Sequence, residues 1–137
     1  MAKDAFHDMV RLALQKEGWT ITDDPLFLRL GDAKIYIDLV AEKLLAATKG
    51  DEKIAVEIKT FADISPIFAF HVAVGQFVNY QVALEKLYPL RILFLAIPEV
   101  IYDTFFQSEL AQSVIKKQQI NLIIYDPEQG VIVKWLT

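Results

Sequence analysis

The spacing of apolar residues predicts three helical segments separated by strands. Near the start, apolar residues recur with a helical period: Phe6, Met9, Val10, Ala13 and Leu14. Gly18 is a natural stop, so the first helix is expected over 3–17. A longer apolar segment over 67–87 follows Ser65 and Pro66, which suit a helix cap and a first helical turn. Helical spacing returns over 99–117.

Short apolar runs between turn signals predict the strands. They cover 19–22, 26–30, 34–39, 44–48, 53–59, 91–97, 121–125 and 131–136. Gly31-Asp32 is a plausible hairpin turn, and a second hairpin is expected around 49–52. A short helix over 41–47 is the alternative to that second hairpin. The nearly wholly apolar run at 91–97 is typical of a strand covered on both faces.

Together these elements predict a single α/β domain over 1–137, built as a mixed β-sheet flanked by helices. The length of 137 residues suits one domain, and 54% hydrophobic residues argue against disorder. No apolar run approaches the roughly 18 residues that a membrane span needs, and no secretory signal opens the sequence. We therefore expect a soluble, cytoplasmic protein.

The composition excludes several kinds of site. The absence of cysteine rules out disulfide scaffolds, thiolate zinc sites and cysteine nucleophiles, and two histidines cannot build a three-histidine metal site. A net charge of −4 argues against a protein that coats nucleic acid by charge alone. We expect weak, salt-sensitive DNA binding by the isolated chain.

The run 53–59 carries the most informative polar residues. Because side chains alternate along a strand, Glu57 and Lys59 share one face near its end. Asp38 ends an earlier apolar run, 19 positions before Glu57. Two carboxylates beside a lysine suit magnesium-dependent phosphodiester hydrolysis, in which carboxylate oxygens hold a hard cation and the lysine positions water or offsets charge. A solvated ion pair on an edge strand is the alternative.

The helix over 67–87 adds a second polar signal. Gln76 and Tyr80 are spaced i, i+4 and so lie on one face of a helix that is otherwise apolar nearly all round. They favour a functional interpretation, although a core helix whose Tyr80 hydroxyl finds a backbone partner is also compatible with the pattern.

The order of these residues resembles the motifs of the PD-(D/E)xK nuclease superfamily: Asp38, then Glu57-Ile58-Lys59, then Gln76 and Tyr80. The last pair resembles the motif of its RecB-like branch. Ile37 departs from the motif, which has proline before the aspartate. More specifically, the whole chain resembles the XisH family of cyanobacteria, the excision controlling factors of the fdxN element. The stretches that carry this resemblance include 6–8, 18–22, 36–39, 41–43, 54–59, 75–77 and 124–128.

This resemblance implies a restriction-endonuclease-like fold and a role in DNA rearrangement beside an XisI-like protein partner. It also implies site roles. Asp38 and Glu57 would hold Mg²⁺ or Mn²⁺, Lys59 would assist the attacking water, Gln76 would orient the site, and Tyr80 would brace Gln76 or touch phosphate. A non-catalytic accessory protein that keeps the fold, and works through its partner, is the rival interpretation.

Three further features leave alternatives open. Glu42 is expected opposite Lys59 across the second hairpin, as an auxiliary ligand or as a structural salt bridge. Asp8 resembles an acidic residue that some of these nucleases place near the metal, yet an exposed helix carboxylate fits equally well. The helix over 67–87 has apolar residues in too many directions for one stripe, so we expect a homodimer or a hetero-complex, unless 99–117 covers it.

Overall fold

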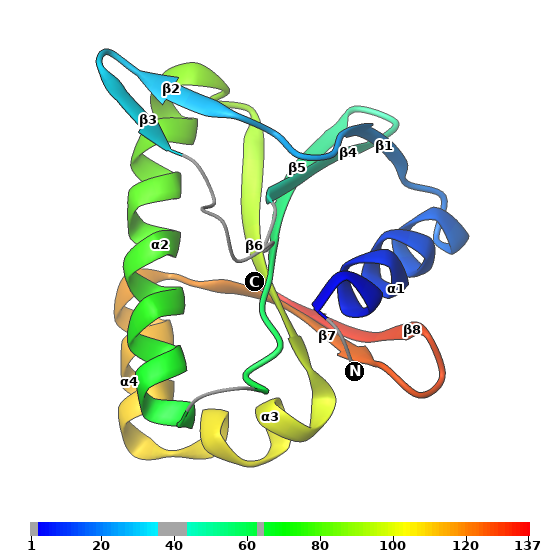
Figure 1. Ribbon diagram of the computed structural model, residues 1–137, viewed down its shortest axis with the longest axis vertical. Coiled ribbons are helices and arrows are strands. Elements are labelled where there is room, and N and C mark those ends of the chain that lie inside the picture. The colour runs from blue at the N-terminus through cyan, green and yellow to red at the C-terminus, as the bar shows by residue number, and fades with distance from the viewer. Residues whose placement is uncertain (1–2, 36–43, 63–64) are drawn as a thin grey trace.

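The computed structural model describes residues 3–35, 44–62 and 65–137 (Figure 1). Its elements are α1 (Lys3–Lys16), β1 (Thr20–Asp23), β2 (Leu28–Leu30), β3 (Ala33–Ile35), β4 (Leu44–Lys49), β5 (Glu52–Ile58), α2 (Pro66–Leu87), β6 (Arg91–Pro98), α3 (Glu99–Asp103), the 3-10 turn η1 (Phe105–Gln107), α4 (Glu109–Gln118), β7 (Asn121–Asp126) and β8 (Val131–Leu136). The order of helices and strands is the expected one, so the prediction of a mixed α/β fold is confirmed.

Six strands form one mixed sheet in the order β1-β4-β5-β6-β7-β8. The central strands β5, β6 and β7 run parallel, and the outer pairings are antiparallel. Strands β2 and β3 form a separate two-stranded hairpin. Figure 1 shows α2 on one side of the sheet and α1 on the other. Helix α2 belongs to the long connection that the parallel strands β5 and β6 require.

Each face of the sheet has its own hydrophobic cluster. Val10 and Leu14 of α1 pack with Val56 and Ile58 of β5 on one face. On the other face, α2 packs on β6 and β7 through a larger cluster that includes Phe77. Strand β5 is therefore buried on both faces, which explains its nearly continuous run of buried residues.

The structure decides between the two alternatives for the second hairpin and divides one predicted helix. The second hairpin is confirmed by the pairing of β4 with β5, so the alternative helix is wrong over 44–47, its described part. The helical stretch over 99–117 is divided into α3, η1 and α4, because the backbone of Thr104 leaves the helical region and Ser108 caps a new helix. The hydroxyl oxygen of Ser108 accepts a hydrogen bond from the amide of Ala111 at 3.3 Å.

By length and composition, α2 resembles a membrane span, and it is the one such helix among residues 3–35, 44–62 and 65–137. Its start has the expected cap, since Ser65 accepts a hydrogen bond from the amide of Phe68 and Pro66 occupies the first turn. One face of α2 packs on the sheet, as in the core helix of a small soluble α/β domain.

Candidate active site at the end of strand β5

Glu57 and Lys59 lie at the end of a central strand rather than on an edge. Strand β5 is flanked by β4 and β6, and both side chains point toward the α2 face of the sheet. Their exposed fractions are only 2% for Glu57 and 5% for Lys59. The alternative of a solvated ion pair on an edge strand is therefore wrong.

The structure brings three of the predicted site residues together. The ammonium nitrogen Nζ of Lys59 lies 3.5 Å from Oε1 of Glu57. The same ammonium donates a hydrogen bond to the amide oxygen Oε1 of Gln76 on α2. A carboxylate, an ammonium and an amide thus meet between the sheet and the helix.

Tyr80 follows Gln76 by one helical turn, as its spacing predicts. Its side chain is buried within the cluster between α2 and the sheet. Tyr80 therefore faces the same interior as Gln76, while the role of its hydroxyl toward Gln76 or phosphate stays a prediction.

The main chain of Lys59 is held from two sides. Its amide donates a hydrogen bond to the carbonyl of Ala96 at 3.0 Å, and its carbonyl accepts one from the hydroxyl of buried Tyr125 at 3.3 Å. Two residues later, Phe61 has a φ of 59°, in the left-handed region that bulky residues rarely adopt, and its ring packs 5.5 Å from that of Phe106. The chain therefore turns sharply after Lys59, at the carboxyl ends of the parallel strands, where open α/β sheets commonly bind ligands.

Burial makes this arrangement costly to maintain. Removing a carboxylate and an ammonium from water costs several kcal/mol per ion, which their mutual attraction repays only when their geometry and hydrogen bonds are good. A pair of apolar residues would fill the same space without that cost. A buried pair of charged groups such as this one marks a candidate functional site.

The remaining predicted site residues are Asp38, Glu42 and Asp8. Asp38 and Glu42 lie outside the described residues. The register between β4 and β5, with Leu44 opposite Glu57, is nevertheless the one from which Glu42 was expected opposite Lys59. Asp8 is exposed on α1, as its structural alternative predicted.

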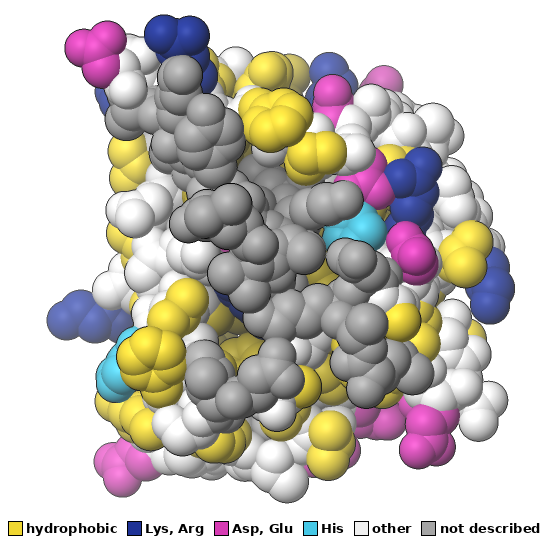
Figure 2. Space-filling view, viewed as in Figure 1, with side chains coloured by type: hydrophobic (Ala, Val, Ile, Leu, Met, Phe, Trp, Pro, Cys, Tyr) yellow, Lys and Arg dark blue, Asp and Glu magenta, His cyan; other side chains and the backbone are white. Residues whose placement is uncertain are grey.

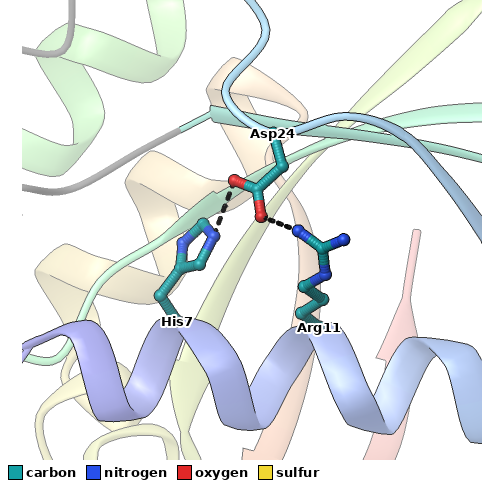
Figure 3. Close-up of polar contacts among 3 residues, drawn as sticks. All are labelled: His7, Arg11 and Asp24. Carbon is teal, nitrogen blue, oxygen red and sulfur yellow. Dashed lines mark hydrogen bonds and ion pairs between the residues drawn. The ribbon is translucent and has the colours of Figure 1, made fainter.

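A second polar cluster joins α1 to the segment after β1 (Figure 3). Nε2 of His7 lies 2.8 Å from Oδ1 of Asp24, so the imidazole donates through Nε2, and the Arg11 guanidinium donates to the other carboxylate oxygen. Burial alone raises the pKa of Asp24, but the hydrogen bonds and charges of His7 and Arg11 outweigh it and hold that pKa below its ordinary value. Local sequence patterns did not predict this cluster, although the i, i+4 spacing of His7 and Arg11 indicates a shared helix face.

The donor set near Lys59 suits a hard cation. Glu57 offers carboxylate oxygens, the ligands that Mg²⁺ and Mn²⁺ prefer, and Asp38 is the second carboxylate predicted for it. Within residues 3–35, 44–62 and 65–137, no three His, Cys, Asp or Glu side chains gather as a metal-binding group. Asp38, the second carboxylate predicted for this site, lies outside these residues.

Comparison with known proteins identifies relatives of this chain. The sequence pattern of the family described as XisH protein matches residues 1–133, nearly the whole chain. The chain belongs to the XisH family. The family assignment made from the sequence is thereby confirmed.

Two crystal structures extend the comparison. One is an XisH family protein from Nostoc punctiforme PCC 73102, and the other is an fdxN element excision controlling factor protein from Anabaena variabilis. Each is 44% identical to this XisH protein, with a TM-score of 0.91, over 98% of this chain and 100% of the other. No match is found among proteins of curated function.

Proposed function

We propose that this XisH protein is a nuclease-like factor that acts on DNA in the cytoplasm during the excision of a genetic element. The name of the Anabaena variabilis relative, an element excision controlling factor, supports the process. The proposed nuclease chemistry is supported by the buried contact between Glu57 and Lys59. The ammonium of Lys59 also donates a hydrogen bond to Gln76.

In this proposal, Glu57 and Asp38 hold Mg²⁺ or Mn²⁺. The bound cation supplies positive charge against the phosphate oxygens and makes water more acidic. Lys59 donates hydrogen bonds that orient the attacking water and offset the charge that develops on phosphate. Gln76 fixes the direction of the Lys59 side chain, and Tyr80 supports the helix turn that carries Gln76.

The second candidate is a non-catalytic accessory protein that controls excision through an XisI-like partner. The net charge of −4 favours it, since a chain of this charge has little general affinity for phosphates and gains from a partner with basic surface. The word "controlling" in the name of the Anabaena variabilis relative also agrees with this candidate.

A cleavage assay distinguishes the two candidates. We expect the purified protein to cleave plasmid, single-stranded or branched DNA with Mg²⁺ or Mn²⁺ and to stop when EDTA is added. Glu57→Gln and Lys59→Gln should each lower the rate by at least about 100-fold, because each removes a charge that acts on the transition state.

The matched controls are Glu52→Gln and Lys53→Gln, since both residues are exposed on the same strand. These variants should cleave as the unchanged protein does. Absence of cleavage on every substrate, by protein that is folded and loaded with metal, would contradict the nuclease candidate and favour the accessory one.

A further inference from the structure

The outer face of α2 carries an uncharged stripe that the rest of the described chain leaves largely exposed. Its members are Phe68, His71, Val72, Gly75, Val78, Asn79 and Val82, and we call it the α2 stripe. Phe68 is 55% exposed and Val82 is 47% exposed, whereas Val78 is half-buried. In Figure 2, hydrophobic side chains gather over the amino-terminal part of α2.

The segment that follows β6 does not cover this stripe. Phe105 and Phe106 pack on Phe70, with ring centroids 5.3 and 5.4 Å away. Phe70 lies on the buried face of α2, while Phe68 lies on the outer face. The expectation that 99–117 could cover the helix entirely is therefore wrong for the α2 stripe.

Within residues 3–35, 44–62 and 65–137, no contact explains Gly75, which lies at the centre of the stripe. Glycine weakens the middle of a helix relative to alanine. A Cβ atom added at Gly75 would meet nothing within 4 Å, and its helical backbone does not require glycine. A residue without a side chain at this position leaves room for the backbone of a second helix to approach closely.

The pattern on each side of Gly75 suits a second copy of the same helix. Phe68 and Val82 lie seven residues before and after Gly75, and His71 and Asn79 lie four residues before and after it. An antiparallel pair of α2 helices related by a two-fold axis at Gly75 therefore places Phe68 of each copy against Val82 of the other. It also places His71 against Asn79 of the other copy, a donor against an acceptor.

We propose that two copies of this chain associate through the α2 stripe, with α2 antiparallel to its counterpart and Gly75 at the crossing. Phe68, Val72, Gly75, Asn79 and Val82 follow one another at alternating spacings of four and three residues. That spacing suits helices packed at about +20°. An interface that uses the same patch on both copies closes after two.

The absence of charged residues agrees with a second copy as the occupant, and the area of the stripe indicates a weak association. No Asp, Glu, Lys or Arg occurs from Pro66 to Leu84, so two chains of net charge −4 meet here without opposed like charges. A helix of 22 residues is about 33 Å long, and a stripe about 10 Å wide gives about 330 Å² per copy. This is less than the roughly 800 Å² per partner of a standard interface, so we expect monomer and dimer to exchange at micromolar concentration.

Cross-linking tests the register, because the natural chain has no cysteine. With a short bismaleimide, Gly75→Cys should link to itself. Phe68→Cys should link to Val82→Cys in a mixture, but not to itself, because two Phe68 positions would lie about 21 Å apart along the helices. Leu110→Cys, at a site 50% exposed on α4, is the control and should not cross-link.

Sedimentation equilibrium tests the association itself, independently of any cleavage of DNA. At about 100 μM we expect the mass of two 15.6 kDa chains for the unchanged protein and for Leu110→Glu, and one chain for Phe68→Glu. Circular dichroism checks that each variant is folded. A monomeric mass for the unchanged protein, or self-linking of Phe68→Cys as efficient as the mixed pair, would overturn the proposal.

Discussion

The ammonium of Lys59 donates a hydrogen bond to the amide oxygen of Gln76, 17 positions later in the chain. Lys59 follows β5 in the sheet, whereas Gln76 lies in the middle of α2. This one contact joins two motifs that are separate in the sequence, and it sets the direction of the Lys59 side chain toward Glu57.

Replacing Gln76 by a residue that cannot accept this hydrogen bond should destabilise the protein. Gln76→Met removes the acceptor with little change in length, and we expect a loss of about 1–3 kcal/mol in the free energy of unfolding. Gln76→Glu retains an acceptor and should lose less. Urea unfolding measures the stability of both variants. Gln118→Met, at an exposed position on α4, is the control. A Gln76→Met variant as stable as this control would contradict the role of the contact.

The local chemistry of the sequence predicts much of the fold. The alternation in β5 predicts that Glu57 and Lys59 share a face, and Ser65-Pro66 predicts the start of α2, because both signals act over a few residues. The position of β5 within the sheet depends on its pairing with β6, a strand more than 30 residues later. Local patterns carry no such long-range information, so the burial of the pair could not be predicted.

Long-range contacts also explain why local patterns did not indicate the roles of Asp24 and Tyr125. Asp24 lies in what reads locally as a turn before Pro25, and only the folded chain brings it to His7 and Arg11. The same is true of Tyr125, whose hydroxyl bonds to the carbonyl of Lys59, 66 positions away. Neither residue has a neighbour in the sequence that indicates its role.

Acid should weaken the contact between α1 and the segment after β1. Because the pKa of Asp24 is lower in the folded protein than in the unfolded chain, its carboxylate contributes stability above the ordinary aspartate pKa. That contribution is lost as pH falls from about 5 through the folded pKa. At pH 7, Asp24→Asn should be less stable by about 1–3 kcal/mol.

Urea unfolding at several pH values between 7 and 3 tests this prediction. The difference in stability between the unchanged protein and Asp24→Asn should shrink as the pH falls. Asp32→Asn, at an exposed position in the turn between β2 and β3, is the control and should follow the unchanged protein. A difference that stays constant down to pH 3 is inconsistent with an ionised Asp24 that His7 and Arg11 stabilise.

DNA binding by the isolated chain should be weak and sensitive to salt. With a net charge of −4, the protein gains little from general attraction to phosphates, and binding rests on a few local contacts. We expect affinity to fall by roughly tenfold or more between 50 and 200 mM salt, measured by fluorescence anisotropy. Nanomolar binding that salt does not change would rule out this description.

Zinc should not copurify with the protein in stoichiometric amount. The chain has no cysteine, and of its two histidines His7 is engaged with Asp24. Oxygen-rich carboxylate sites select hard cations instead. Elemental analysis of protein expressed with added zinc should find well below one zinc per chain, and one tightly held zinc per chain would refute the predicted ligand set.

Binding of Mn²⁺ tests most directly whether Glu57 helps to hold a divalent cation beside Lys59. Isothermal titration calorimetry of the unchanged protein should show a Mn²⁺ site that is lost in Glu57→Gln and retained in Glu52→Gln, the exposed carboxylate on the same strand. Circular dichroism confirms that both variants are folded. Loss of the Mn²⁺ site in Glu57→Gln but not in Glu52→Gln is the expected result; equal Mn²⁺ binding by Glu57→Gln, or no binding by the unchanged protein, would contradict a metal-holding role for Glu57.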